Sequence, residues 1–262
     1  MSNSSGNRSD SLVAFRDVSF TINGGRPIID HLDLDVAQGE TLVLLGESGC
    51  GKTTTLRLVN RLLTPTAGEV RVENKATTEW NVIRLRRRTG YVIQDAGLFP
   101  HFTVAENVAL VPSLEQWTPD RVQRRTNELL DLVGLEATQF ANRYPRELSG
   151  GQRQRVGVAR ALAADPPLLL MDEPFGALDP LTRASLQKEF SEMKARLGKT
   201  VIFVTHDVRE ALMLGSRIAL MDAGKIVLLE GPSEFVKSEN KLARAYLETL
   251  SEPPAVAGGP ER

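Results

Sequence analysis

The sequence predicts an α/β fold with a mostly parallel sheet, an antiparallel β flap and a helical subdomain. Nearly continuous apolar runs are typical of strands that a parallel sheet buries on both faces. These runs are Thr41–Leu45, Tyr91–Ile93, Pro167–Met171 and Val201–Val204. Leu32–Val36 and Val70–Val72 alternate apolar with polar residues, which predicts half-exposed antiparallel strands. Residues 95–155 show helical patterns without a convincing strand, which predicts a helical insertion.

Two helices are marked by their ends and by an apolar stripe. Thr118 and Pro119 form an N-cap and first-turn pair. The stripe of the helix that follows consists of Val122, Leu129, Leu130 and Val133. A second amphipathic helix is predicted to end near Gly198, because glycine often terminates helices. Its stripe consists of Leu181, Leu186, Phe190, Met193 and Leu197.

The composition is that of an ordinary globular chain, with 262 residues of which 41% are hydrophobic and 25% charged. A formal net charge of −1 supplies no basic field, so we expect no nucleic-acid partner. A single cysteine excludes an internal disulfide and suits a reducing compartment. Residues 1–10 and 251–262 are predicted to be flexible tails without a signal peptide. The apolar runs are far shorter than the roughly 20 residues that span a bilayer.

A glycine-rich segment lies between the predicted strand Thr41–Leu45 and a helical pattern that opens at Lys52, which is the context of a phosphate-binding P-loop. Its backbone amides and helix N-terminus are expected to bind phosphates. Lys52 is expected to reach the β- and γ-phosphates, and Thr53 to bind Mg²⁺. The nucleotide-binding residues are Gly46, Glu47, Ser48, Gly49, Cys50, Gly51, Lys52, Thr53 and Thr54. Cys50 is interpreted as a tolerated small residue, with a redox sensor as the alternative.

Polar residues follow the other predicted strands, at the edge where open parallel sheets bind ligands. They are Gln94, Asp172, Glu173 and His206. Asp172 is expected to bind Mg²⁺ with Thr53, and Gln94 to contact the metal or the attacking water. Glu173 is expected to orient or deprotonate this water, and His206 to bind the γ-phosphate and hold Glu173. The alternatives are helix caps for the two acids and a structural role for the histidine.

A second anion-binding helix start is predicted from Ser149, Gly150, Gly151 and Gln152, because serine and two glycines open an apolar helix there. A second phosphate site is redundant in one chain. The segment resembles the signature motif of ABC transporter ATPase subunits, and Ala177–Asp179 resembles the D-loop of that family.

The resemblance runs from about Leu12 to Leu250 and implies ATP and Mg²⁺ as ligands. It implies a P-loop NTPase fold with a RecA-like core and flap at 11–94 and 156–250, and a helical subdomain at 95–155. It further implies a head-to-tail dimer of two copies, in which the P-loop of one and the Ser149 turn of the other sandwich ATP. Asp179 would lie along the dimer seam.

The family usually places an aromatic residue against adenine near the end of the first strand. Aligning Asp17–Phe20 with that strand puts Ile22 at this place. Two interpretations follow: adenine packs on the apolar Ile22, or Phe20 substitutes for the usual aromatic residue.

The segment Gln94–Phe102 is unusually apolar for a loop. It is either an inward-facing core loop or a surface that a partner covers. In the resembling family this region docks transmembrane permease subunits, which would hold the chain at the cytoplasmic face of the cell membrane.

Three stretches of the chain are similar to ATPase subunits of importers for quaternary-amine osmoprotectants such as glycine betaine, choline and carnitine. These stretches are Leu58–Val70, Tyr91–Val108 and Arg143–Pro180. The similarity implies an extracytoplasmic substrate-binding protein as an indirect partner. Many members carry CBS domains after the ATPase domain, and we expect none before Arg262. The alternatives are an importer of another solute, an exporter and a soluble ATPase outside transport.

Overall fold

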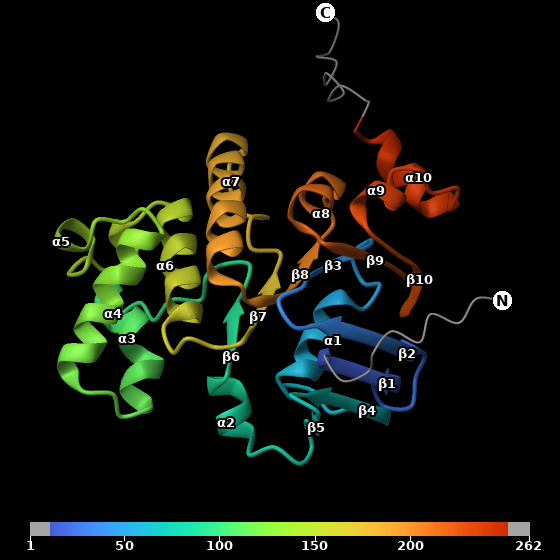
Figure 1. The fold of residues 1–262 in the computed structure, drawn as a ribbon, viewed down its shortest axis with the longest axis horizontal. Helices are drawn as coiled ribbons and strands as arrows, with labels where there is room; N and C mark the ends of the chain where they lie inside the picture. The colour runs from blue at the N-terminus through green and yellow to red at the C-terminus, as the bar shows by residue number, and fades with distance from the viewer. Residues whose placement is uncertain (1–10, 251–262) are drawn as a thin grey trace, which may run out of the picture.

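Two β-sheets and the helices around them make up the computed structural model, which describes residues 11–250 without the side chains of 195–197 (Figure 1). The predicted tails 1–10 and 251–262 lie outside the described residues, as does the Leu197 side chain.

The larger sheet has the strand order β10-β9-β3-β8-β7-β6 and is parallel except for the pair β9–β10. Its strands are β3 (Thr41–Leu45), β6 (Thr89–Val92), β7 (Leu168–Asp172), β8 (Thr200–Thr205), β9 (Arg217–Asp222) and β10 (Lys225–Glu230). Every residue of β3 and β8 is buried. The strands predicted from continuous apolar runs are confirmed: β3 has the predicted ends, and the ends of the other three differ by one or two residues. Strands β9 and β10 were not predicted, although β9 carries the apolar run Ile218–Met221.

The smaller sheet is the predicted antiparallel flap, with the order β2-β1-β4-β5. Its strands are β1 (Ser11–Thr21), β2 (Pro27–Ala37), β4 (Ala67–Val72) and β5 (Lys75–Ala76). The alternating runs are confirmed as strands, because Leu32, Leu34 and Val36 are buried while Asp33 is exposed. The larger sheet and the flap meet around helix α1 (Lys52–Val59), which lies behind β1 and β2 in Figure 1.

Alternate residues of the buried strands enter two different cores, because successive side chains of a strand point to opposite faces. On β3, Leu42 and Leu44 pack with α1 and the flap. Val43 and Leu45 pack with helices on the other face of the sheet. The continuous apolar runs therefore serve two cores at once, which holds β3 and its loop firmly in place.

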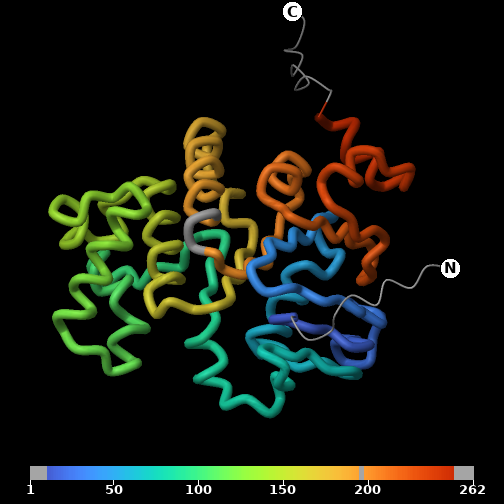
Figure 2. The backbone as a smooth tube through the Cα atoms, viewed as in Figure 1, coloured from blue at the N-terminus to red at the C-terminus, as the bar shows by residue number. Residues whose placement is uncertain are grey.

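Helices occupy the stretch between β6 and β7, and within the described residues no strand occurs there. They are α3 (Val104–Leu114), α4 (Pro119–Leu132), α5 (Ala137–Phe140), the 3-10 helix η1 (Pro145–Glu147) and α6 (Gly150–Leu162). Figure 2 shows this stretch, in green to yellow, leaving the sheet on one side and returning to it. Helix α6 runs through the predicted boundary at residues 155 and 156, so the helical part and the core share one continuous helix.

The remaining helices flank the two sheets. They are α2 (Val82–Arg87), α7 (Pro180–Leu197), α8 (Val208–Leu214), α9 (Pro232–Phe235) and α10 (Lys241–Glu248). Helix α7 ends at Gly198, which has φ 57°, as predicted. Leu181 was wrongly assigned to its buried stripe, because this side chain is 85% exposed at the first turn. Thr118 does precede α4, but its side chain makes no capping hydrogen bond.

Across residues 11–250, none of the helices is long and apolar enough to span a lipid bilayer.

Candidate functional site

The predicted site residues follow strands whose C-terminal ends are aligned by sheet register. Leu45 of β3 pairs with Thr205 of β8, and Asp172 of β7 pairs with Val204. Because these strands are parallel, the residues that follow them emerge at one edge of the sheet. The register therefore brings the glycine-rich loop, Glu173 and His206 together.

The loop Gly46–Gly51 takes backbone conformations that a side chain would obstruct. Gly51 has φ 108°, and a Cβ atom there would lie 2.7 Å from Ile29 Cδ1 and 2.9 Å from Ile28 O. A Cβ atom on Gly46 would clash with the carbonyl oxygen of Met221. The glycines thus let the loop lie against β2 and β9 while it leads into α1. No side chain caps α1 at Gly51, so its N-terminus is left for an anion.

Lys52 folds its side chain back over the loop. Its buried ammonium group donates hydrogen bonds to the carbonyl oxygens of Gly46 at 2.7 Å and Glu47 at 2.8 Å. Backbone carbonyls are neutral acceptors and leave this positive charge without a carboxylate partner within 4 Å in the described residues. A phosphate group would supply the missing negative charge, so the loop fits a nucleotide.

A hydroxyl and a carboxylate, the oxygen ligands that Mg²⁺ prefers, stand together beside the loop. Thr53 Oγ1 donates a hydrogen bond to Asp172 Oδ1 at 2.8 Å, and the Tyr91 hydroxyl lies 3.4 Å from Asp172 Oδ2. Burial raises the pKa of Asp172, while the hydrogen bond from Thr53 and the charge of Arg57 oppose this rise. The described residues hold no cluster of three or more His, Cys, Asp or Glu side chains, so a cation here would keep waters or phosphate oxygens as ligands.

Glu173 and His206 face each other across the ends of β7 and β8. His206 Nδ1 lies 3.2 Å from Glu173 Oε2. The Glu173 amide donates to the carbonyl of Val204 at 3.1 Å, and Glu173 has φ 45°. This backbone conformation is uncommon for a residue other than glycine and is held by the neighbouring strand. The geometry suits a carboxylate that orients a water and a histidine that holds that carboxylate.

Gln94 lies near the same acid. A Cβ atom on Gly176 would be 3.3 Å from Gln94 Nε2 and 3.6 Å from Glu173 Oε2, so both side chains border Gly176. Gln94 is exposed and makes no side-chain hydrogen bond with a described residue. Its predicted contact with the metal or the water stays a prediction.

The turn at Ser149 differs from the glycine-rich loop in its hydrogen bonds and in the face of the sheet on which its helix packs. Ser149 Oγ accepts from the Gln152 amide at 3.3 Å, and Gln152 Oε1 accepts from the Ser149 amide at 2.9 Å. Helix α6 packs on the face of the sheet opposite α1. None of the hydrogen bonds found in residues 11–250 joins this turn to the loop Gly46–Thr54. In a single chain, the two predicted phosphate-binding segments do not share one site.

The Ser149 turn instead borders the loop that precedes α7. A Cβ atom on Gly150 would lie 3.7 Å from Leu178 Cδ2, and one on Gly151 would clash with the Thr182 methyl group. Asp179 caps α7 by accepting from the Thr182 amide at 3.1 Å, and hydrogen bonding by the Thr182 side chain and amide lowers the Asp179 pKa. The Ser149 turn and Asp179 therefore belong to one surface.

The two candidates for adenine contact differ in exposure. Phe20 is only 8% exposed and pairs with Ile29 within the flap. Ile22, just after β1, is 57% exposed. Ile22 is therefore accessible to a ligand, whereas Phe20 is not.

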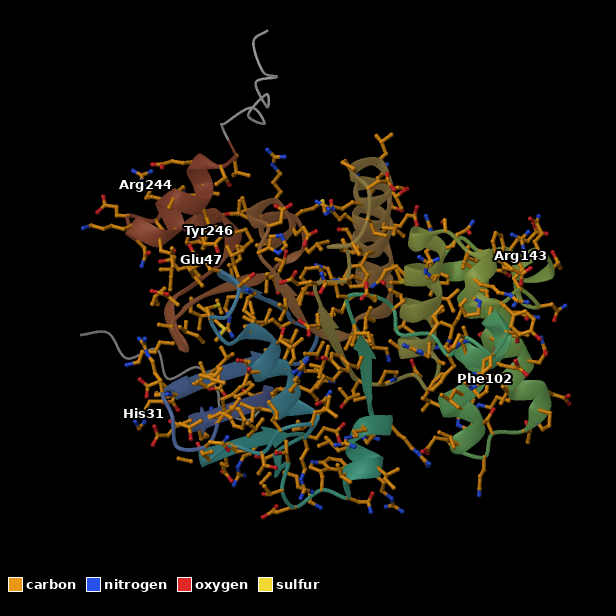
Figure 3. The ribbon with its side chains drawn as sticks, turned by 180° about the vertical axis from the view of Figure 1, so that it is seen from behind. His31, Glu47, Phe102, Arg143, Arg244 and Tyr246 are labelled. Carbon is orange, nitrogen blue, oxygen red and sulfur yellow. The ribbon has the colours of Figure 1, made fainter. Side chains whose placement is uncertain are left out.

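Two neighbours of the loop were missed by sequence reasoning. Tyr91 lies in a predicted strand, where its hydroxyl could have been foreseen only from the register that places it beside Asp172. Tyr246 of α10 lies beside Glu47 in Figure 3, and burial together with the acidic groups of Cys50, Glu47 and Asp222 raises the pKa of Tyr246 to about 12. No local motif marks this proximity, because α10 and the loop are far apart in sequence.

The predicted apolar segment forms an aromatic cluster. Phe99 is 41% exposed, and its ring centroid lies 5.3 Å from that of Phe102. Arg160 Nη1 donates to Gly97 O at 2.7 Å and so holds the segment against α6. A groove beside Phe99 is lined on its apolar side by Tyr91, Leu110 and Val111. The interpretation as an inward-facing core loop is wrong for Phe99, and partner docking stays a prediction.

The family model described as ABC transporter matches residues 29–176, more than half of the chain. The chain belongs to the ABC transporter family. Its curated relatives include the glycine betaine/carnitine/choline transport ATP-binding protein OpuCA of Bacillus subtilis, 48% identical over 87% of this chain and 60% of that protein. The glycine betaine uptake system ATP-binding protein YehX of Escherichia coli is 49% identical over 90% of this chain and 76% of that protein.

Solved structures of ABC cassettes agree with the fold. The ATP-binding cassette MJ0796, in a dimeric post-hydrolysis state bound to ADP and Pi, matches with TM-score 0.75 and 33% identity over 84% of this chain and 99% of that chain. CbiO1 from Clostridium perfringens matches with TM-score 0.80 and 26% identity over 92% of this chain and 97% of that chain. This ABC chain spans about 60% of the length of relatives such as OpuCA. The predicted P-loop NTPase fold with its flap and helical part is confirmed.

Proposed function

We propose that this chain is the ATP-binding and ATP-hydrolysing motor subunit of an ABC importer for a quaternary-amine osmoprotectant. One observation carries the hydrolytic part: Glu173 faces His206 at the sheet edge where Lys52 and the pair Thr53–Asp172 also stand. These are the groups that phosphoryl transfer to water needs, namely a phosphate cradle, a metal site and a positioned base.

In this mechanism, the loop Gly46–Thr54 holds the triphosphate through its amides, and Lys52 exchanges its carbonyl partners for phosphate oxygens. Thr53 and Asp172 would hold Mg²⁺, which when bound neutralises phosphate charge. Glu173 accepts a proton from the attacking water, and His206 keeps the carboxylate oriented. Gln94, whose side chain borders Gly176 as that of Glu173 does, would contact the metal or this water, and the exposed Ile22 would offer an apolar surface for adenine.

The Ser149 turn supports a dimer, because it has the build of an anion site but lies apart from the P-loop of its own chain. In a head-to-tail pair of copies, each Ser149 turn meets the phosphates held by the other copy, with Asp179 along the seam. The closed dimer exists only while the γ-phosphate bridges the copies, so hydrolysis releases it. ATP binding would thus close the dimer, and ATP hydrolysis would let the two copies part.

The test is a Glu173→Gln variant. Removing the base lowers turnover about a hundredfold to ten-thousandfold while ATP still binds, so the variant accumulates as an ATP-dependent dimer. ATP turnover and size-exclusion light scattering with ATP and with ADP measure both effects. Glu192→Gln, an exposed glutamate on α7, is the matched control and behaves as wild type. Unchanged turnover removes Glu173 as the base, and a strictly monomeric E173Q protein with ATP overturns the dimer.

The aromatic cluster around Phe99 is proposed to dock the transmembrane permease, which would place the chain at the cytoplasmic face of the membrane. Exposed aromatic surface beside an apolar groove is typical of a partner interface. Phe99→Asp therefore abolishes co-purification with the permease and leaves the ATPase rate of the isolated chain within about twofold, because Phe99 lies outside the phosphate site.

The substrate class is proposed from the relatives, whose names specify glycine betaine, carnitine or choline. Cargo recognition would lie with an extracytoplasmic binding protein that acts through the permease. Purifying the complex from membranes and heating its binding protein with candidate ligands tests this. Stabilisation by betaine-like compounds supports the proposal, and stabilisation by amino acids or sugars alone overturns it.

A further inference from the structure

A buried carboxylate stands behind the His206 turn. Glu210 of α8 is 5% exposed, yet none of the motifs described above includes it. Its Oε2 accepts from the Thr205 hydroxyl at 2.5 Å, and its Oε1 accepts from Gln187 Nε2 at 2.8 Å. Burying a carboxylate is costly unless its oxygens are bonded, and here each oxygen has a donor. A bonded buried acid at this place indicates a specific role in holding neighbouring groups.

The hydrogen bonds around Thr205 have a fixed direction. The hydroxyl has one proton, and it points to Glu210. The hydroxyl oxygen is then free to accept from the Asp207 amide at 3.0 Å. Thr205 and Asp207 are the residues on either side of His206, so these two bonds clamp the peptide that carries the imidazole. His206 in turn contacts Glu173 at 3.2 Å.

Helix α7 is the anchor of this clamp. Gln187, which holds Oε1 of Glu210, lies one turn from Arg183 on the same helix face. Arg183 Nη2 donates to Leu178 O at 3.0 Å and Gly176 O at 3.4 Å, in the loop that leads to Asp179. Burial raises the pKa of Glu210, and the charge of Arg183 is among the groups that oppose the rise. One face of α7 therefore holds both the His206 turn and the Gly176–Leu178 loop.

We propose that Glu210 is a positioning residue for ATP hydrolysis: through Thr205 it fixes the His206 turn, and through Gln187 it ties that turn to the helix that also holds the Gly176–Leu178 loop. The inference rests on the proposed roles of His206 and Glu173. It predicts a loss in kcat rather than in ATP binding, because the phosphate cradle lies on β3 and α1.

Three variants test the clamp in the full chain. In Glu210→Ala, kcat falls about tenfold or more while KM for ATP stays within about twofold, since only the orientation of reacting groups is lost. Thr205→Val removes the hydroxyl but keeps its shape and gives a similar loss. The double variant is no slower than the slower single variant, because both changes break one chain of bonds.

Glu210→Gln separates hydrogen bonding from mere space filling. A glutamine can accept from Thr205 and donate to Gln187 once the Gln187 amide turns round, so kcat returns to within about threefold of wild type. Glu192→Ala is the control for an exposed glutamate on α7 and leaves kcat unchanged. A Glu210→Gln protein as slow as Glu210→Ala overturns the clamp.

His206→Ala distinguishes this inference from the proposed function. If His206→Ala loses turnover but Thr205→Val and Glu210→Ala keep kcat within about twofold of wild type, the clamp is wrong and the role of His206 stands. If His206→Ala keeps full turnover, the proposed role of His206 fails first. Should Glu210→Ala not fold, Thr205→Val and Glu210→Gln still decide the matter, and melting temperatures of all variants show which losses are structural.

Discussion

The two helix starts that we propose as anion sites are built in opposite ways. Helix α1 begins at Gly51 without a capping side chain, and Lys52 beside it donates to two backbone carbonyls and to the Cys50 sulfur. Helix α6 begins at Ser149 with a complete capping box, in which Ser149 and Gln152 satisfy each other. The amides at the start of α1 stay open to a ligand, whereas those at the start of α6 are bonded within the chain.

The two sites therefore differ in what they require before phosphate can bind. The P-loop has its shape in one chain, because glycines without a Cβ atom let it lie against β2 and β9. In the proposed dimer, the Ser149 turn would exchange its internal hydrogen bonds for bonds to a phosphate that the other copy presents. Binding at the first site is thus expected to depend on this chain alone, and binding at the second on a dimer.

We expect the strongest loss of ATP binding when the charge of the P-loop lysine is removed. Lys52→Met removes the ammonium group and weakens ATP binding about a hundredfold, because a charge-assisted bond to phosphate is lost. Equilibrium binding of a fluorescent ATP analogue to dilute monomer measures this. Ser149→Ala, measured in the same way, leaves the monomer affinity unchanged. Equal losses in the two variants would mean that one chain uses both segments.

Alanine in place of glycine is expected to destabilise the start of α1 more than the start of α6. Gly51→Ala lowers the free energy of unfolding by about 2 kcal/mol, because a Cβ atom meets Ile28 and Ile29 at a positive φ. Gly150→Ala, whose Cβ would find no neighbour closer than 3.7 Å, changes stability little. Urea unfolding of both variants measures the difference, and equal stabilities would show that the P-loop shape does not depend on Gly51.

The smallest effect concerns the dimer. In a Glu173→Gln background, Ser149→Ala weakens ATP-dependent dimerisation about tenfold, because one hydrogen bond to the partner's phosphate is lost at each site. Analytical ultracentrifugation with ATP gives the dimer constant. Gln152→Ala is the control for the capping box: it opens the cap by removing the glutamine but keeps the serine hydroxyl, so dimerisation is weakened less. A Ser149→Ala protein that dimerises like its parent excludes the hydroxyl from the sandwich.

The sequence predicts an element correctly where its pattern is compatible with one kind of structure. The strand Thr41–Leu45 is buried at every position and apolar from Leu42 to Leu45, because its two faces belong to two cores, and this excludes a half-exposed strand. Sequence reasoning failed at Leu181, which follows helical spacing but sits on the first turn, where nothing covers it. The place of Tyr246 near the acidic groups of Glu47 and Asp222 was also not predicted, because residues so far apart in sequence leave no local signal.

The residues that could bind a nucleotide can be read from the sequence, because a P-loop is a local motif whose glycines and lysine lie within eight residues of one another. The contact between Glu173 and His206, and the hydrogen bond by which Glu210 holds Thr205, follow from the packing of the folded chain. These contacts join β7, β8 and α8, and they depend on strand register and on burial. Both are properties of the packed sheet, because a single strand can pair in any register until its neighbours bury it.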